Sequence, residues 1–213
     1  MQRFAIIRNI DLLTQQLARL KDKKSREYCH SLLRESRRQL AWTDIEQQGA
    51  SDRPAGLFRS DARILDSHIR LPSGDCKPSL FPSMIIDPGP GLCIVDVNFA
   101  CTRELMRPGW ELIGSKLFKI CPDNAATLAA EGVANAFAAM ADVMTIGKPQ
   151  ILPSQRYDIS DPKGSWHERH WRVECKPLRD SDGTIAFISL EFERTEPEVE
   201  GGTPVQRYNH RAA

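Results

Sequence analysis

Residues 84–98 read MIIDPGPGLCIVDVN, and this stretch indicates the start of a sheet-based domain. Its two short apolar runs are separated by the turn-forming residues 87–91, a pattern typical of a β-hairpin. Asn98 follows the second run, and its side-chain oxygen can accept a hydrogen bond from a free N–H group at the start of a helix. We therefore predict two strands and then a helix over Phe99–Met106, which Pro108 ends.

The sequence downstream predicts one long helix and three further strands. Apolar residues recur at helical spacing over residues 124–145, and Gly147 ends this pattern. The residues expected to face inward are Leu128, Val133, Phe137, Met140 and Met144. Residues 151–159, 165–178 and 184–192 have strand character, with turn residues between them. This order predicts an α+β fold in which a five-stranded antiparallel sheet carries helices on one face.

Residues 1–47 predict an α-helical hairpin ahead of this domain. Apolar residues recur every three or four positions from Phe4 to Leu20 and again from Cys29 to Leu40. Ser25 is the predicted cap of the second helix. The connecting turn is short, so the two helices should pack antiparallel. Because a hairpin this small cannot bury all its apolar surface on itself, we expect it to contact a second copy of the chain or the downstream domain.

The remaining segments complete a four-part organisation. Pro and Gly are dense in residues 48–82, which we predict to be a linker with one apolar island at residues 61–71. The sheet domain is expected over residues 83–195, and residues 196–213 are predicted to be a flexible tail.

Charge and cysteine usage favour a cytoplasmic protein. The chain has a net charge of +1, but residues 1–41 contain ten basic and four acidic residues, a net charge of +6 that leaves −5 for the rest. Few aromatic residues accompany these basic side chains, so a solvated helix face is favoured over a nucleic-acid site. The six cysteines form no C-x-x-C pair, which fits a reducing compartment. No stretch reaches the ~20 apolar residues that span a bilayer, so we expect no membrane contact.

Several short motifs, in this order, resemble the PAS domain family. Val95-Asp96-Val97-Asn98 looks like the strand-to-helix junction of PAS domains, and Glu111-Leu112-Ile113-Gly114 looks like their E-L-I-G bend. Three denser motifs are similar to those of a group of bacterial PAS proteins: Pro122-Asp123-Asn124, Arg156-Tyr157-Asp158-Ile159 and Glu168-Arg169-His170-Trp171. The resemblance covers about half of the chain and implies a sensory domain.

The residues that two PAS cofactors would need are missing. Light-oxygen-voltage members carry a reactive Cys directly after the bend, where this sequence has Leu117, and we expect Cys121 to be a buried small hydrophobe. Haem-binding members usually take an axial imidazole from the long helix, yet no histidine lies between His68 and His167. We predict no cofactor, and disfavour both a covalent flavin adduct and a histidine-ligated haem on the long helix. His167 and His170 should lie on opposite faces of a strand, so no metal site is expected.

A non-covalent ligand in the domain core is still compatible with the sequence. The candidate cavity residues combine apolar area with polar tips, as binding pockets do. They are Phe99, Leu117, Phe137, Met140, Arg156, Tyr157, His170 and Trp171, with Arg156 or Arg172 available to an acidic ligand.

The sequence favours a sensor over an enzyme, since it contains no G-x-S-x-G, P-loop, H-E-x-x-H or G-x-G-x-x-G motif. The main hypothesis is a signal-transduction protein that acts through association, either as a homodimer through the hairpin and the outer sheet face or with an unidentified signalling protein. The alternatives are a small-molecule receptor and, less favoured, a nucleic-acid-binding regulator that uses the basic hairpin.

Overall fold

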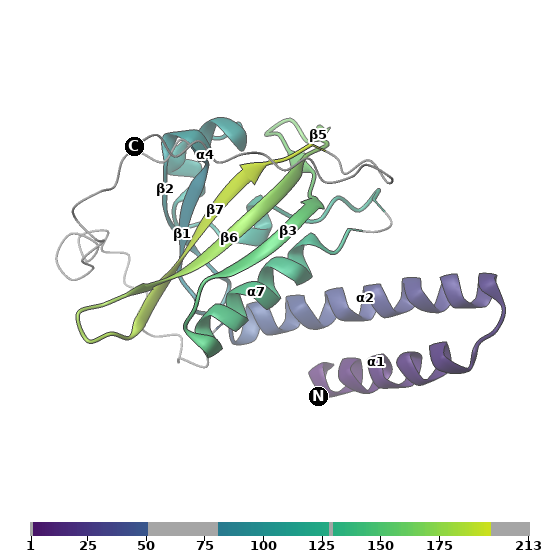
Figure 1. The fold of residues 1–213 in the computed structure, drawn as a ribbon. Coiled ribbons are helices and arrows are strands. Elements are labelled where there is room, and N and C mark those ends of the chain that lie inside the picture. Colours follow the sequence, from purple (N-terminus) through teal and green to yellow (C-terminus); the bar gives the residue numbers. More distant parts are fainter. Residues whose placement is uncertain (1, 51–80, 128–129, 197–213) are drawn as a thin grey trace, which may run out of the picture.

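The chain folds into an antiparallel sheet with helices on one face, joined to a two-helix hairpin (Figure 1). The computed structural model describes residues 2–50, 81–127 and 130–196. The sheet has the order β2-β1-β7-β6-β3. Its strands are β1 (Ser83–Ile86), β2 (Ile94–Val97), β3 (Gln150–Arg156), β6 (His170–Arg179) and β7 (Ile185–Arg194). The predicted α+β fold with a five-stranded antiparallel sheet is confirmed.

Asn98 connects the first hairpin to helix α4 (Phe99–Glu104), as predicted. Its side-chain oxygen accepts hydrogen bonds from the backbone N–H groups of Cys101 at 2.8 Å and Ser83 at 3.0 Å. One residue therefore caps α4 and ties it to β1. The helix is shorter than predicted because Met106 has a left-handed backbone, with φ 53°.

Three further helices follow, and the longest starts later than predicted. They are α5 (Gly109–Leu112), α6 (Leu117–Ile120) and α7 (Gly132–Ile146). The helix predicted from residue 124 begins at Gly132 because the preceding polar side chains bind elsewhere: Asn124 donates to Asp158, and Asp123 accepts from the Val133 N–H at the start of α7. Leu128 lies outside the described residues.

Two of the predicted strands are each divided in the structure. The strand predicted at residues 151–159 is divided into β3 and β4 (Ile159–Ser160). The strand predicted at residues 165–178 is divided into β5 (Trp166–His167) and β6, and β4 and β5 form a separate two-stranded ladder. The break occurs where Tyr157 turns its ring inward. Its backbone N–H donates to Arg169 O at 2.9 Å, and its hydroxyl donates to Cys121 O.

The N-terminal helices α1 (Gln2–Arg19) and α2 (Lys23–Gln47) form the predicted hairpin. Asp22, and not Ser25, caps α2, because its carboxylate accepts both the N–H of Ser25 at 2.9 Å and its hydroxyl at 2.8 Å. Leu13, Cys29 and Leu33 form a small core between the two helices.

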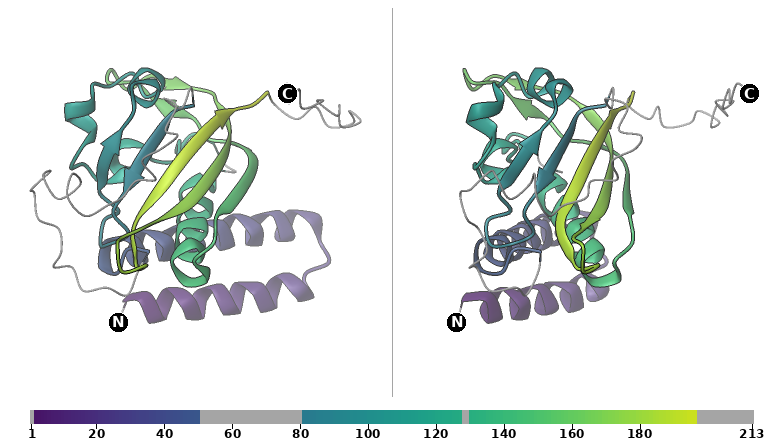
Figure 2. Two further views of the ribbon diagram at one scale, coloured as in Figure 1. Left: turned by 60° about the vertical axis from the view of Figure 1, so that its left-hand side comes forward. Right: turned by 90° about the vertical axis from the view of Figure 1, so that its left-hand side faces the viewer.

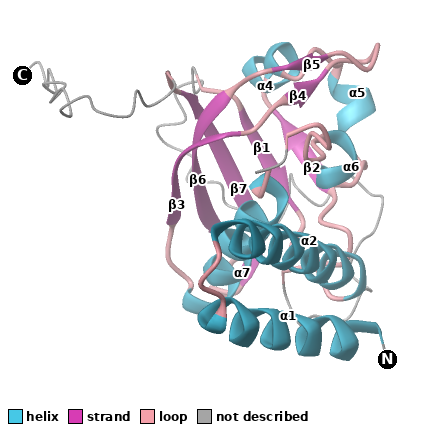
Figure 3. Ribbon diagram, turned by 90° about the vertical axis from the view of Figure 1, so that its right-hand side faces the viewer, coloured by secondary structure: helices cyan, strands magenta, loops and turns pink. Residues whose placement is uncertain are grey.

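The last turns of α2 belong to the core of the sheet domain. Ala41, Ile45 and Ala50 are part of the same buried cluster as the inner face of the sheet. The N–H of Ala50 donates to Pro88 O at 2.8 Å, and that of Gly91 donates to Ile45 O at 2.7 Å. In Figures 2 and 3, α2 lies between α1 and the sheet domain. The core of the sheet domain thus includes residues on both sides of residue 47, where the predicted hairpin ends. Residues 51–80 of the predicted linker, with its apolar island at 61–71, and residues 197–213 of the predicted tail lie outside the described residues.

Candidate functional site

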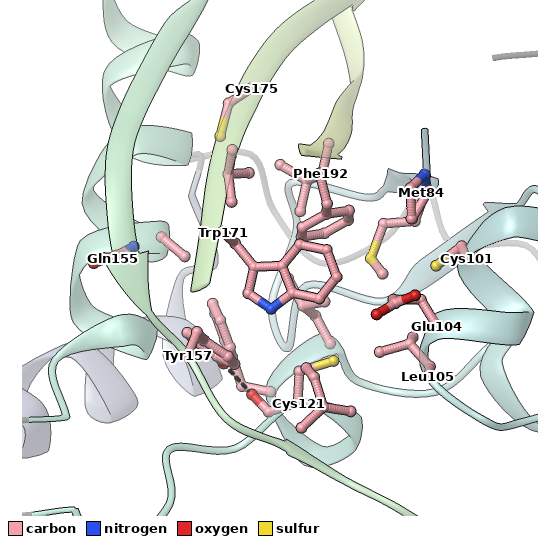
Figure 4. Close-up of a pocket in the computed structure, with 17 residues that line it drawn as sticks. Met84, Cys101, Glu104, Leu105, Cys121, Gln155, Tyr157, Trp171, Cys175 and Phe192 are labelled. Atoms are coloured by element: carbon pink, nitrogen blue, oxygen red, sulfur yellow. Dashed lines mark hydrogen bonds between the residues drawn. The ribbon is translucent and has the colours of Figure 1, made fainter. Parts of the chain in front are cut away.

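An apolar cavity of about 60 Å³ lies between the inner face of the sheet and the short helices (Figure 4). The sheet contributes side chains at every second position, as the pleat requires. These are Met84 on β1, Trp171, Val173 and Cys175 on β6, and Leu190 and Phe192 on β7. The rings of Trp171 and Phe192 meet edge to face, with centroids 6.1 Å apart.

The opposite wall comes from α4, α6 and the residue after α6. It includes Cys101 and Glu104 of α4, Leu105 directly after that helix, Leu117 and Phe118 of α6, and Cys121. Because Asn98 fixes the first turn of α4, it also sets the direction of Cys101 and Glu104. Tyr157 and Ile159 line the end of the cavity where β3 has ended.

Three cysteine thiols line the cavity, and all three are neutral. Burial raises the pKa of Cys101, of Cys121 and of Cys175 to about 12. A thiol with so high a pKa is a poor nucleophile and a poor metal ligand. These side chains act as small, polarisable hydrophobic groups.

The cavity contains one buried donor without a partner. Trp171 is only 4% exposed, and its indole Nε1–H meets no acceptor among the described residues. A buried donor without an acceptor costs about 1–3 kcal/mol. The neighbouring Tyr157 hydroxyl is already used, since it donates to Cys121 O, and burial raises the pKa of Tyr157 well above its ordinary value.

Glu104 is the acidic residue of the cavity wall. Its carboxylate lies 3.4 Å from Arg169 Nε and 4.0 Å from Arg194 Nη1. These two arginines, one after β5 and one at the end of β7, balance its charge.

A polar cluster around Asp158 lies beside the cavity and joins two of the sequence motifs, residues 122–124 and residues 156–159. Asp158 is buried, and its carboxylate accepts from Arg156 at 2.8 and 3.0 Å, from Asn124 at 2.8 Å and from Thr127 at 3.3 Å. Burial acts to raise the pKa of Asp158, but the hydrogen bonds from Arg156 and Asn124 outweigh it, so the pKa is lowered. The cluster anchors the segment before α7 to the end of β3.

Three of the predicted cavity residues line the cavity: Leu117, Tyr157 and Trp171. Phe99 does not, because the first residue of α4 points outward and its side chain is 76% exposed. Arg156 is bound to Asp158 and also lies 3.0 Å from Glu168. His170 precedes Trp171 on β6 and therefore faces the other side of the sheet.

The two predicted residues from α7 lie in the core but do not line the cavity. Met140 is fully buried, and Phe137 is partly buried against the same core. Ala136 is the α7 residue that reaches the cavity. The prediction missed Met84, Cys101 and Phe192, although the alternation along β1 and β7 would have identified Met84 and Phe192 as inward-facing.

A flavin does not fit this cavity. About 60 Å³ is much less than three fused rings need, and Leu117, which has no thiol, occupies the position of the reactive Cys in the light-oxygen-voltage motif. Among the described residues, no group of three or more His, Cys, Asp or Glu side chains is arranged to hold a metal ion. None of the described helices combines the length and apolar character needed to cross a bilayer.

Comparison with known proteins shows similarity to several solved sensory domains. No family model matches the sequence, and no curated protein matches it. A light-oxygen-voltage domain studied with a flavin analogue is 14% identical, with a TM-score of 0.42 over 55% of this chain and 78% of that one. The light-oxygen-voltage protein of Rhodobacter sphaeroides is 10% identical, with a TM-score of 0.41 over 56% and 62% of the two chains. A sensory box sensor histidine kinase from Vibrio cholerae is 16% identical, with a TM-score of 0.39 over 54% and 81%.

Proposed function

We propose that this chain, a PAS-type α+β domain with an N-terminal helical hairpin, is a cytoplasmic signal-transduction protein whose output is a change in association. It would act as a homodimer or with a signalling protein, without catalysis of its own. The described cysteines, all free thiols, fit a reducing compartment. The proposal rests chiefly on how the hairpin is attached to the domain.

The hairpin is bound to the sheet domain through the last turns of α2 and exposes apolar side chains on α1. Ile45, near the end of α2, is buried in the main core. On α1, Phe4 is 72% exposed and Leu12 is 50% exposed. These two residues are eight positions apart and so lie near one face of the helix. We propose that a partner chain covers these two side chains and so joins them into one apolar contact. A change in the core that displaced α2 would thus move an interaction surface.

The association should be measured by light scattering coupled to size-exclusion chromatography. We expect the full chain to be a dimer and the Phe4→Ser, Leu12→Ser double variant to be a monomer. The basic hairpins of two copies repel each other, so 0.5 M salt, which screens such charges, should favour the dimer over 0.15 M salt.

The matched control is Trp110→Ser on α5. Trp110 is also exposed, at 78%, but belongs to the sheet domain rather than to the hairpin. This variant should remain a dimer. A wild-type chain that is monomeric at every concentration and salt would exclude homodimerisation, and equal weakening by both variants would exclude the hairpin as its site.

A second function, reception of a small molecule in the cavity, is favoured by one observation. Trp171 lines the cavity, and its buried Nε1–H has no acceptor among the described residues. Native mass spectrometry and an absorption spectrum of the purified protein provide the test. Retained mass above that of the polypeptide supports reception, and a colourless protein with no retained mass leaves it unsupported.

A further inference from the structure

The cavity between the sheet and the short helices presents a wholly apolar surface. Trp171 contributes carbon atoms only, because its Nε1 atom has essentially no accessible surface. The Glu104 carboxylate is paired with Arg169 Nε at 3.4 Å and adds no polar surface to the wall. The Tyr157 hydroxyl donates to Cys121 O and is used as well. A molecule inside this cavity therefore makes no hydrogen bond with its walls.

A wall of this kind selects against every molecule that carries a polar atom. A polar group that moves from water into an apolar site without a hydrogen-bond partner is disfavoured, and a charged group is disfavoured far more. Water is excluded for the same reason, since a buried water needs about two to four polar partners. Apolar cavities stay dry, yet they take up apolar species such as xenon and benzene. The occupant should therefore be apolar throughout.

The atoms that line the cavity are suited to dispersion contacts. Four of them are sulfur atoms, which are polarisable, and they belong to Met84, Cys101, Cys121 and Cys175. An empty cavity leaves such atoms without a neighbour on one side, and an occupant restores the lost contacts. Burial raises the pKa of each of the three thiols to about 12, so they do not attack a bound molecule.

The volume of the cavity limits the size of the molecule. The cavity measures about 60 Å³. Roughly 10–15 Å³ of such space accommodates one water-sized sphere, so about four to six fit. A carbon atom with its hydrogens is about as large as a water molecule, so the occupant should have no more than about six non-hydrogen atoms.

We propose that this cavity binds a small molecule that is wholly apolar, either a dissolved apolar gas or a hydrocarbon of up to about six carbon atoms. This inference rests on the receptor function proposed above and specifies its ligand class. The burial of apolar surface and the dispersion contacts supply the binding free energy, without a hydrogen bond or a covalent bond.

Cyclopentane and tetrahydrofuran form a matched pair of probes. Both are five-membered rings of nearly the same shape, but tetrahydrofuran has an ether oxygen in place of one CH₂ group. This oxygen would lose its hydrogen bonds to water and gain none in the cavity. Cyclopentane should therefore bind the full chain at least about tenfold more tightly. Xenon, which is also apolar, should compete with cyclopentane.

The methyl groups of the methionines report where the probes bind. Met84 lines the cavity, whereas Met140 is buried in the core without lining it and Met106 is partly exposed. In carbon–proton NMR spectra, cyclopentane should shift the Met84 methyl resonance most among the five methionines, and the shift should saturate. The dissociation constants of both probes follow from these titrations.

Ala136→Val tests the site by filling part of it from α7. Ala136 is the residue of α7 that lines the cavity, so the two added methyl groups take up space that the probe needs. This variant should bind cyclopentane at least about tenfold more weakly than the wild type. Ala138→Val makes the same change at an exposed position of the same helix and should keep the wild-type affinity.

Three outcomes would overturn the proposal. They are tetrahydrofuran binding as tightly as cyclopentane, a Met84 resonance that neither cyclopentane nor xenon shifts, and equal loss of binding in Ala136→Val and Ala138→Val. If Ala136→Val does not fold, the Met84 shift and the preference for cyclopentane in the wild-type chain still decide the question.

Failure of this ligand class can be distinguished from failure of the proposed function. If no apolar probe shifts Met84 but native mass spectrometry finds a retained molecule with polar atoms, reception stands and only the ligand class is wrong. The dimer is measured separately by light scattering, so its presence or absence does not depend on the probes.

Discussion

Asp87 illustrates how the environment of one residue can make stability depend on pH. It follows β1, is 7% exposed, and accepts a hydrogen bond from the Gly89 N–H at 2.7 Å. Burial raises its pKa from 3.8 to about 6, and the Gly89 hydrogen bond only partly opposes this. The titratable group near Asp87 is the thiol of Cys93. Around Cys93 also lie Lys116 and Glu46, which form an ion pair with each other.

Asp87→Asn should therefore stabilise the protein at neutral pH. The folded state binds the Asp87 proton more tightly than the unfolded state, so this residue's stabilising contribution is complete below about pH 4 and is lost as the pH rises through about 6. Since one pKa unit corresponds to about 1.4 kcal/mol, the variant should gain at most about 3 kcal/mol at pH 7 and only about 0.5 kcal/mol at pH 4.

Urea denaturation from pH 4 to pH 8 checks this prediction. The control is Asp142→Asn, at an exposed position of α7, whose curve should run parallel to that of the wild type. A gain for Asp87→Asn that is the same at pH 4 and pH 7 would show that titration of Asp87 is not its cause.

At the scale of elements, α2 serves two structures at once. It packs on α1 through Cys29 and Leu33, and its last turns also pack on the sheet domain through Ala41 and Ile45. A continuous helix shared in this way transmits displacement between its ends, because its backbone hydrogen bonds hold it rigid.

Ile45→Ala should destabilise the sheet domain by about 2–4 kcal/mol, since it removes a large side chain that is 1% exposed and leaves a cavity. Tryptophan fluorescence during urea denaturation measures the loss. Arg37→Ala, at an exposed position of the same helix, should change stability by no more than about 0.5 kcal/mol. A loss below about 1 kcal/mol for Ile45→Ala would mean that α2 is not an integral part of the domain.

At the scale of the whole molecule, the two buried clusters separate the hairpin core from the domain core. Removal of residues 1–21 deletes α1 and the small Leu13 core but leaves Ile45 and the domain core intact. We expect this truncated chain to keep the folded sheet domain and to be monomeric. Near-UV circular dichroism and light scattering measure the two properties. Loss of the near-UV signal would show that the domain depends on α1, and a persistent dimer would place the association surface elsewhere.

The sequence determined the elements that depend on local chemistry. Asn98 caps α4 with its side chain, and Asp87 accepts a hydrogen bond within the turn at residues 87–91. Gly147 ends α7 with φ 71°, a conformation that its lack of a Cβ atom allows. The order of strands and helices and the fold class followed from these signals and from apolar periodicity. The candidate cavity residues, chosen because they combine apolar area with polar tips, include three that line the cavity: Leu117, Tyr157 and Trp171.

Only the tertiary structure decided features that depend on contacts between distant residues. Asp158 binds Asn124, 34 positions away, and so delays the start of α7. A Cβ atom on Gly132 would lie 2.0 Å from the Tyr157 ring, so this glycine is required for space and not for its backbone angle. Likewise, Trp171 Nε1–H has no acceptor among the described residues because β1, β6, β7, α4 and α6 enclose it. Periodicity in a sequence shows which side of an element faces inward, but the partners that a side chain meets there are set by elements far away along the chain.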